Sequence, residues 1–308
     1  MSEQTAVKVE KLVVAFGDFK AVNEVSFEVA QGEIFGFLGA NGAGKTTTIR
    51  VLCGLLPPTA GAVTVAGADP SIDAMSVKSR VGYMSQRFTL YRDMTIGENL
   101  NFTGKLRKLG YEAIRSRIKE LIDFIELEWP LSTMVADLPA GVLQQVALVS
   151  ATMHDPQIVF LDEPTAGVTP HARSRFWELI GKMSEAGKTV FVTTHYMDEA
   201  EQCGRVALMR SGELIALGSP AELKESTFPE PLFELSPSTD AGAGWQAALR
   251  SQKFCKELET FGMHYHVLAD APAAFESYVA RELPEFSHKR INPSLEDVFI
   301  RLVEGRER

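Results

Sequence analysis

A glycine-rich loop constrains the fold of this chain more than any other stretch of its sequence. Residues 39–46, GANGAGKT, fit the phosphate-loop pattern G-x-x-x-x-G-K-[ST] at every fixed position. The apolar run of residues 34–38 before the loop suits a buried strand, and residues 47–52 after it have a helical pattern. This order of strand, loop and helix predicts an α/β protein that binds a nucleoside triphosphate.

The residues of this loop have distinct expected roles. Its glycines let backbone N–H groups and the positive end of the next helix face phosphate oxygens. Lys45 is expected to reach the β- and γ-phosphates, and Thr46 to place its hydroxyl on Mg²⁺. The residues of this segment expected to bind ATP are Gly39, Asn41, Gly42, Ala43, Gly44, Lys45, Thr46 and Thr47. A chance match in a glycine-rich turn is the alternative, which the flanking strand and helix disfavour.

Two adjacent carboxylates form a second chemical stretch, in the run QIVFLDEP of residues 157–164. Apolar residues that lead into two acids indicate a buried strand whose acidic end emerges at the edge of a sheet. Asp162 is then placed to hold Mg²⁺, directly or through water, and Glu163 is free to polarise an attacking water. A strand that ends in two solvated acids is the alternative, and the upstream loop makes it the weaker one.

Three more side chains are candidate contacts, each with a structural alternative. Gln86 and His195 follow short apolar runs, and strand ends of an open α/β sheet present ligand contacts. Gln86 could touch Mg²⁺ or the attacking water, or be a solvated loop residue. His195 could donate to a γ-phosphate, or be a capping or core imidazole. Phe16 either stacks on a purine ring or packs in the core.

Charge and composition disfavour several classes of function. The 308 residues have a formal net charge of −9 and a pI near 5.3. Nucleic acid is therefore not an expected partner, because its binding relies on clustered Lys and Arg. The sequence has neither an apolar run of about 18 residues nor the basic start of a signal peptide. We expect a cytoplasmic chain whose membrane contact is peripheral.

The cysteines and two of the histidines do not form a metal or disulfide pattern. Cys53, Cys203 and Cys255 are unevenly spaced and lack a C-x-x-C pair, so ordinary buried thiols are expected. His264 and His266 lie two apart without a third ligand, so both are expected on the surface.

Hydrophobic periodicity divides the chain into two expected domains, residues 1–225 and residues 226–308. The first begins with strands at residues 7–16, 21–30 and 34–38, which are expected to form a sheet edge that leads into the phosphate loop.

A helical subdomain of about residues 88–153 is expected within the first domain. Residues 96–128 are predicted to be helical, and a second helix is predicted at residues 141–153 with Pro139 at its start. The second domain is predicted to be a small α+β unit that alternates strands with helices. Its predicted strands and helices are residues 232–235, 245–254, 264–268, 273–281, 288–291 and 295–303.

From about Val7 to Leu223 these residues resemble the ATP-binding cassette (ABC) ATPase family. The resemblance implies a RecA-like P-loop domain with an antiparallel edge sheet and a helical subdomain, ATP and Mg²⁺ as cofactors, and ATP hydrolysis. By position it implies an adenine-stacking Phe16, a Walker A loop at residues 39–46, a Q-loop Gln86, a Walker B Asp162, a catalytic Glu163 and a switch His195. The implied metal contacts are Thr46, Gln86 and Asp162.

Two segments depart from the family pattern. The signature, usually Leu-Ser-Gly-Gly, reads Leu138-Pro139-Ala140-Gly141, and residues 167–170 read GVTP where GLDP is usual. Such ATPases pair head to tail, and each signature acts on the partner's ATP. Because Pro139 lacks a hydroxyl and an N–H, we expect a heteromer with a second, intact cassette rather than a homodimer. The alternative is that Leu-Pro-x-Gly works as it stands.

The closing residues 293–299 and the Leu-Pro-x-Gly signature resemble exporter ATPases of the bacterial drug and multidrug efflux branch. Their permease is a separate integral membrane protein, so the resemblance implies an efflux ATPase on the inner face of the cell membrane. A soluble ABC ATPase of translation or DNA repair and a regulatory cassette with little turnover are the alternatives. The single cassette and acidic charge disfavour the first, and Glu163 and His195 disfavour the second.

Overall fold

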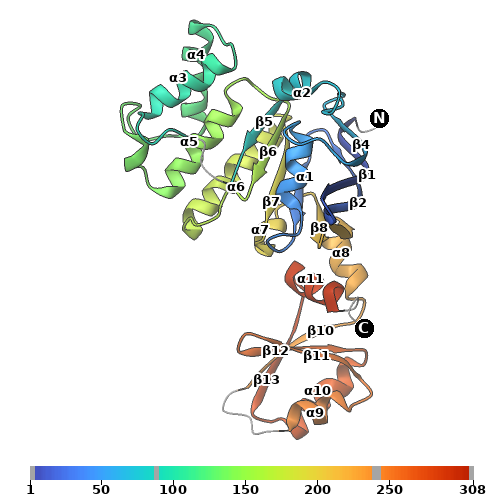
Figure 1. The fold of residues 1–308 in the computed structure, drawn as a ribbon. Coiled ribbons are helices and arrows are strands. Elements are labelled where there is room, and N and C mark those ends of the chain that lie inside the picture. The colour runs from blue at the N-terminus through green and yellow to red at the C-terminus, as the bar shows by residue number, and fades with distance from the viewer. Residues whose placement is uncertain (1–3, 87–89, 238–243, 305–308) are drawn as a thin grey trace. The chain divides into compact units, whose positions relative to one another are not determined.

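The structure of the protein is a computed structural model that describes residues 4–86, 90–237 and 244–304 (Figure 1). The chain divides into two compact units, Met1–Pro220 and Ala221–Arg308. Each unit has a hydrophobic core of its own. Among the described residues, no helix combines the length and the apolar composition that crossing a bilayer requires.

A six-stranded sheet forms the centre of the first unit (Figure 1), with the strand order β5-β6-β7-β3-β8-β9. Its strands are β3 (Ile34–Leu38), β5 (Val81–Met84), β6 (Ile158–Asp162), β7 (Thr189–Thr194), β8 (Arg205–Arg210) and β9 (Glu213–Gly218). All pairs are parallel except β8 with β9. Every residue of β6 and β7 is buried, which is why β6 is apolar up to Asp162 and β7 contains no polar residue larger than threonine. Strand β3, expected in a sheet edge, instead lies inside this sheet.

A separate antiparallel sheet packs against α1 on the side away from the six-stranded sheet (Figure 1). It confirms the predicted antiparallel edge sheet. Its strands are β1 (Thr5–Phe16), β2 (Phe19–Ala30) and β4 (Ala60–Val65), in the order β2-β1-β4, and α1 spans Lys45–Leu52. Five phenylalanine rings from the two sheets cluster with neighbouring centroids 5.3 to 6.0 Å apart: Phe27, Phe35, Phe37, Phe160 and Phe191. Each buried ring contributes roughly 1.5–3 kcal/mol of transfer free energy, so the cluster fixes β2 against the central strands.

The described part of the helical insertion between β5 and β6 contains three α-helices and one 3₁₀ turn (Figure 1). The α-helices are α3 (Ile96–Leu106), α4 (Tyr111–Phe124) and α5 (Ala140–Thr152). The prediction that residues 96–128 are helical throughout is wrong, because α3 ends at Leu106 and Lys108 has a left-handed φ of 60°. The predicted start of the subdomain near residue 88 lies outside the described residues.

Helix α5 begins one residue before the predicted range of 141–153. Pro139 is the N-cap, with an extended backbone at φ −60° and ψ 151°, and Ala140 is the first helical residue. The prediction that proline occupies the first helical position is therefore wrong. The remaining helices of the unit are α2 (Ala74–Arg80), a 3₁₀ turn at Val135–Asp137, α6 (Pro170–Glu185) and α7 (Met197–Ala200).

The second unit is a four-stranded antiparallel sheet with helices, in the strand order β11-β12-β10-β13. Its elements are α8 (Pro220–Thr227), β10 (Leu232–Pro237), α9 (Trp245–Arg250), β11 (Cys255–Phe261), β12 (His264–Ala269), α10 (Pro272–Glu282), β13 (Phe286–Ile291) and α11 (Leu295–Glu304). Strand β11 was not predicted. It is an edge strand that carries charged residues, so it lacks the apolar alternation by which half-buried strands are recognised.

Two expectations for single side chains of this unit are wrong. His266 is buried, not a surface residue, and its Nδ1 lies 2.7 Å from Oδ1 of Asp297 on α11. This partner is 31 positions away in the sequence, where no local pattern could indicate it. Cys255 is only half-buried, whereas Cys53 and Cys203 are buried as expected, and His264 is exposed.

Candidate functional site

The glycine-rich loop lies between β3 and α1 with backbone angles that favour glycine. Gly44 is the N-cap of α1 at φ 107°, and a Cβ on it would collide with the carbonyl oxygen of Ala21. A Cβ on Gly39 would likewise collide with the carbonyl oxygen of Met209 on β8. The loop is thus held tightly between the hairpin of the antiparallel sheet and strand β8. Its geometry presents the N-terminus of α1 at the carboxyl end of β3.

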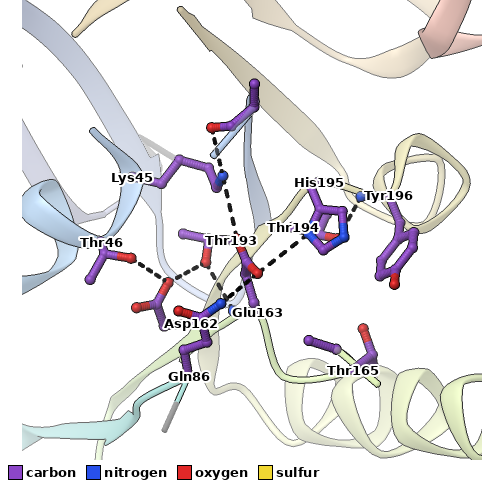
Figure 2. Close-up of polar contacts among 12 residues, drawn as sticks. Lys45, Thr46, Gln86, Asp162, Glu163, Thr165, Thr193, Thr194, His195 and Tyr196 are labelled. Carbon is purple, nitrogen blue, oxygen red and sulfur yellow. Dashed lines mark hydrogen bonds and ion pairs between the residues drawn. The ribbon is translucent and has the colours of Figure 1, made fainter. Parts of the chain in front are cut away.

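The ammonium group of Lys45 is held by the loop that precedes it. Lys45 is 4 % exposed, and its Nζ donates to the carbonyl oxygens of Gly39 at 2.7 Å and Ala40 at 3.2 Å. The same Nζ lies 3.5 Å from Oε1 of Glu163 (Figure 2). A buried ammonium needs such partners, since an unpaired one would carry a large desolvation cost. The lysine is therefore oriented across the mouth of the loop, toward the end of β6.

Asp162 at the end of β6 has two hydroxyl neighbours and one free oxygen. Its Oδ1 accepts hydrogen bonds from Thr46 Oγ1 at 3.1 Å and Thr193 Oγ1 at 2.7 Å (Figure 2). Its Oδ2 is buried and has no hydrogen-bond partner among the described residues. A buried carboxylate oxygen is costly without a partner. A threonine hydroxyl beside a free carboxylate oxygen is the kind of donor set that Mg²⁺ prefers, so these residues fit that ion.

Glu163 is the centre of the polar contacts in Figure 2. Its backbone has a left-handed φ of 48°, and its N–H donates to Thr193, to the carbonyl oxygen at 3.1 Å and to Oγ1 at 3.0 Å. Its Oε2 accepts from Nε2 of Gln86 at 2.9 Å and lies 3.3 Å from Nδ1 of His195. That Nδ1 has no hydrogen-bond partner within the described part of the chain. The carboxylate is thus flanked by Lys45, Gln86 and His195.

The structure brings together side chains from four elements or their ends. Lys45 and Thr46 begin α1, Gln86 follows β5, Asp162 and Glu163 end β6, and His195 follows β7. Gln86 contacts Glu163 through its amide nitrogen. This arrangement follows from the parallel strands, whose carboxyl ends meet at one edge of the sheet.

The negative charge of Asp162 reaches groups behind the site. Burial and, second to it, the nearby charge of Asp162 together raise the pKa of Tyr83 to about 12. The pKa of the Cys53 thiol is also raised, first by burial and then by Asp162. Both groups are therefore neutral near pH 7, and neither adds a second negative charge beside the carboxylate.

Phe16 and the signature segment lie on the surface. Phe16 ends β1, is 55 % exposed and pairs with Phe19 across the hairpin, so the core alternative does not hold. In the signature segment Leu138 is buried, whereas Pro139 and Ala140 are exposed.

Contacts at the start of α5 tie the signature helix to the loop after β6. A Cβ on Gly141 would lie 2.8 Å from Cβ of Ala172 on α6, so α5 and α6 approach closely here. Nε2 of buried Gln144 donates to the carbonyl oxygen of Ala166 at 3.2 Å. Thr169 caps α6, since its side chain accepts from the N–H of Ala172. The hydroxyl found where the family pattern has aspartate thus retains a helix-capping role.

Sequence reasoning missed one residue that touches the site directly. Thr193 contacts both Asp162 and the backbone of Glu163, and it is fully buried. The two threonines that end an otherwise apolar strand just before His195 were the available signal.

Comparison with known proteins identifies relatives along most of the chain. The sequence profile of a family described as ABC transporter matches residues 22–166. A probable multidrug ABC transporter ATP-binding protein, YbhF of Escherichia coli (strain K12), is 43% identical over 235 residues, which are 75% of this chain. The chain spans only 41% of the length of that relative. Nod factor export ATP-binding protein I of Rhizobium leguminosarum bv. viciae is 36% identical over 297 residues, 95% of this chain and 93% of that protein.

Solved structures share the fold of the first unit. An ATP-binding subunit of an ABC transporter superposes with a TM-score of 0.65 at 26% identity, covering 72% of this chain and 93% of that one. CbiO1 from Clostridium perfringens, part of the ABC transporter complex cbiONQ, gives a TM-score of 0.66 at 27% identity, covering 72% and 91%. These values confirm the predicted α/β cassette fold.

Proposed function

Because the chain belongs to the ABC transporter family of ATP-binding subunits, which are ATPases, we propose that it hydrolyses ATP to drive an exporter through a separate membrane permease. The relatives named for multidrug transport and Nod factor export support the exporter class. In this proposal the chain works in the cytoplasm, bound peripherally to the inner face of the cell membrane. The transported compound contacts the permease, not this chain.

In the proposed nucleotide site the loop and Lys45 hold the phosphates. The N–H groups of residues 39–47 and the N-terminus of α1 provide a positive field for the anion. Lys45 would exchange its contacts with Gly39, Ala40 and Glu163 for the β- and γ-phosphates. Phe16, exposed at the end of β1, is available to stack on the adenine ring.

The proposed metal contacts are Thr46 and Asp162, with Gln86 beside them. The buried Oδ2 of Asp162 without a hydrogen-bond partner supports this assignment. When bound, Mg²⁺ neutralises charge on the β- and γ-phosphates. Thr193 orients the carboxylate by its hydrogen bond to Oδ1.

Glu163 is the proposed general base, and its set of partners carries the proposal for hydrolysis. The carboxylate is 9 % exposed and has Lys45, Gln86 and His195 around it, so it is oriented and shielded while remaining able to accept a proton. Once Lys45 moves to the phosphates, Glu163 is free to take a proton from the attacking water. His195, with a ring nitrogen that lacks a hydrogen-bond partner in the described residues, is placed to donate to the γ-phosphate.

The proposed partner in the catalytic pair is a second cassette. Pro139 is the N-cap of α5, and it lacks both a hydroxyl and the first of the four N–H groups that have no partner within a helix. Ala140, Gly141 and Val142 keep the other three, so the preference for a heteromer rests on the missing hydroxyl and one missing N–H. ATPase activity of the pure chain against its concentration tests it: a steep cooperative rise to several turnovers per second would contradict the heteromer.

Substitution of Glu163 by Gln tests the hydrolytic role. Glu163→Gln should leave Mg-ATP binding intact and lower single-turnover hydrolysis in the assembled complex by about 10²–10⁴, the usual contribution of a general base. Glu178→Gln, an exposed position on α6, is the matched control and should be unaffected. Lys45→Ala should instead weaken binding itself. Hydrolysis unchanged in Glu163→Gln would reject the assignment.

A further inference from the structure

A buried carboxylate outside the proposed catalytic set joins two loops of the site. Glu199 on α7 is 1 % exposed, although glutamate is rarely buried without a partner. Its Oε1 accepts a short hydrogen bond from Oγ1 of Thr165, which is also 1 % exposed and lies in the loop after Glu163. Glu199 therefore links the segment that follows β6 to the segment that follows β7.

Half-buried Arg173 on α6 contacts this buried pair from the side. Its Nε lies 3.3 Å from Oε1 of Glu199, and its guanidinium carbon lies 4.0 Å from the centroid of the Tyr196 ring. A guanidinium at that distance attracts the face of an aromatic ring, more strongly where water is excluded. Arg173 thus neutralises the buried carboxylate and at the same time holds Tyr196.

The ring of Tyr196 is in turn packed against the imidazole of His195. The two ring centroids are 4.1 Å apart, and Figure 2 shows the rings side by side at the end of β7. The backbone N–H of Tyr196 donates to Oγ1 of Thr194 at 3.0 Å, which fixes the turn between the strand and α7. The orientation of His195 toward Glu163 therefore depends on where Tyr196 is held.

We propose that Glu199, with Thr165 and Arg173, is a positioning residue for hydrolysis: it holds Tyr196 and hence orients His195 toward Glu163 and the γ-phosphate. None of the three need touch ATP. The three residues connect the loop that begins with Glu163 to the loop that begins with His195. The distance between the two catalytic side chains therefore stays fixed. The inference rests on the proposed function, because it assigns a role relative to that reaction.

The test compares substitutions of the neighbouring acids Glu199 and Asp198, each made in the full chain and measured in its assembled complex. Glu199→Gln keeps the shape of the side chain and removes the charge that binds Arg173, and should lower kcat about tenfold to a hundredfold, the range that a small misplacement of catalytic groups produces. The affinity for ATP, measured in the Glu163→Gln background, should change less than about twofold. Asp198→Asn is the matched control. It removes the exposed carboxylate that lies 3.4 Å from the same Arg173, and should leave kcat within about twofold.

A double-substitution cycle shows whether Glu199 acts through His195. In a His195→Ala background, Glu199→Gln should cause little further loss of kcat, because the group that it positions is already absent. If Glu199→Gln lowered kcat by the same factor with and without His195, the inference would be overturned. So would a wild-type kcat in folded Glu199→Gln.

A second pair of variants covers the case in which Glu199→Gln does not fold. Tyr196→Phe keeps the ring between Arg173 and His195 and should retain kcat, whereas Tyr196→Leu should lose it to the same degree as the Glu199 variant. Equal kcat in the two Tyr196 variants would also overturn the inference. A different result would reject the proposed function: unchanged hydrolysis in Glu163→Gln. That result does not depend on how the Glu199 variants behave.

Discussion

At the scale of single residues, the backbone of Glu163 determines where the proposed base points. A left-handed φ of 48° on a residue with a Cβ costs roughly 1–2 kcal/mol. Two hydrogen bonds from its N–H to Thr193 hold the residue in this conformation. The turn directs the carboxylate away from the strand and toward Lys45, Gln86 and His195. This local strain is thus balanced by contacts at the site itself.

The shared hydroxyl of Thr193 gives the first prediction. Thr193→Val preserves the shape of a fully buried side chain but removes the hydroxyl, which donates to Asp162 and accepts from the Glu163 N–H; the bond from that N–H to the Thr193 carbonyl remains. We expect a loss of about 1–3 kcal/mol in the free energy of unfolding, because buried polar groups lose a partner. We also expect at least tenfold weaker Mg-ATP binding, measured by equilibrium titration.

Thr189→Val on the same strand is the control for this prediction. Thr189 is buried and its hydroxyl accepts from the N–H of Gly32 at 3.0 Å, at the opposite end of β7. Thr189→Val should lose a similar free energy of unfolding without a change in ATP affinity. Equal ATP affinities in the two variants would contradict the role given to Thr193.

At the scale of elements, His154 just after α5 makes stability depend on pH. Its Nε2 lies 3.0 Å from the carbonyl oxygen of Val81, and burial, followed by the charge of Arg107, lowers its pKa to about 4. An unfolded histidine titrates near 6.5. Between pH 6.5 and 4 the unfolded chain therefore binds more protons, so the contribution of His154 is complete above pH 6.5 and is lost as pH falls toward 4.

The second prediction compares the wild type with His154→Gln. On lowering the pH from 7 to 5, the free energy of unfolding of the wild type should fall further than that of the variant, by about 1 kcal/mol after allowing for partial solvent screening of the ring. Denaturant unfolding at both values of pH measures the difference. Parallel falls in the two proteins would show that the ring accepts its proton as readily when folded.

The N-terminus of α5 gives the third prediction, which concerns the signature. Pro139 offers no side-chain cap, so Pro139→Ser should stabilise the chain by about 0.5–2 kcal/mol. If the missing hydroxyl limits the partner's site, the same change should raise ATPase activity of the pure chain about tenfold or more. Pro139→Ala restores the N–H without a hydroxyl and should give a smaller gain, so the difference between the two variants measures the effect of the hydroxyl. A stabilised Pro139→Ser with unchanged turnover would support a homodimer.

Elements that the sequence predicted well are those whose signal is local. Strand, loop and helix around Lys45 follow one another within a short stretch, and β6 is an apolar run up to Asp162 because both of its faces are buried. Strand β11 was missed because it is a charged edge strand. The roles of Thr193 and Glu199 were also missed, because they depend on contacts with residues about 30 positions away that only the sheet topology brings together.

At the scale of the whole molecule, the two units have separate cores, which gives the fourth prediction. The core of the second unit is built from residues of β10 to β13 and α9 and α10, such as Phe233, Val267 and Phe275. A chain shortened after Glu225 should fold and bind ATP with an affinity within about threefold of the full chain, as expected of an independent domain.

A chain shortened after Gly212 is the control for this prediction. It lacks β9, whose loss leaves β8 as an unpaired edge beside the phosphate loop, so it should be clearly less stable. Circular dichroism and nucleotide titration of both chains check the outcome. A folded chain ending at Glu225 that failed to bind ATP would show that the nucleotide site needs the second unit.

The interior position of β3 in the large sheet also determines when the nucleotide site can form during synthesis. Its neighbours are β7 and β8, which begin at Thr189 and Arg205, whereas β3 ends at Leu38. A ribosome that adds about 5–20 residues per second needs on the order of ten seconds to make the intervening chain. Throughout that time an apolar strand and a phosphate loop have left the ribosome without the strands that hold them. The nascent chain is therefore expected to be a substrate for chaperones during this time. A product of translation interrupted before β7 should not bind ATP, because its phosphate loop lacks the supporting strands.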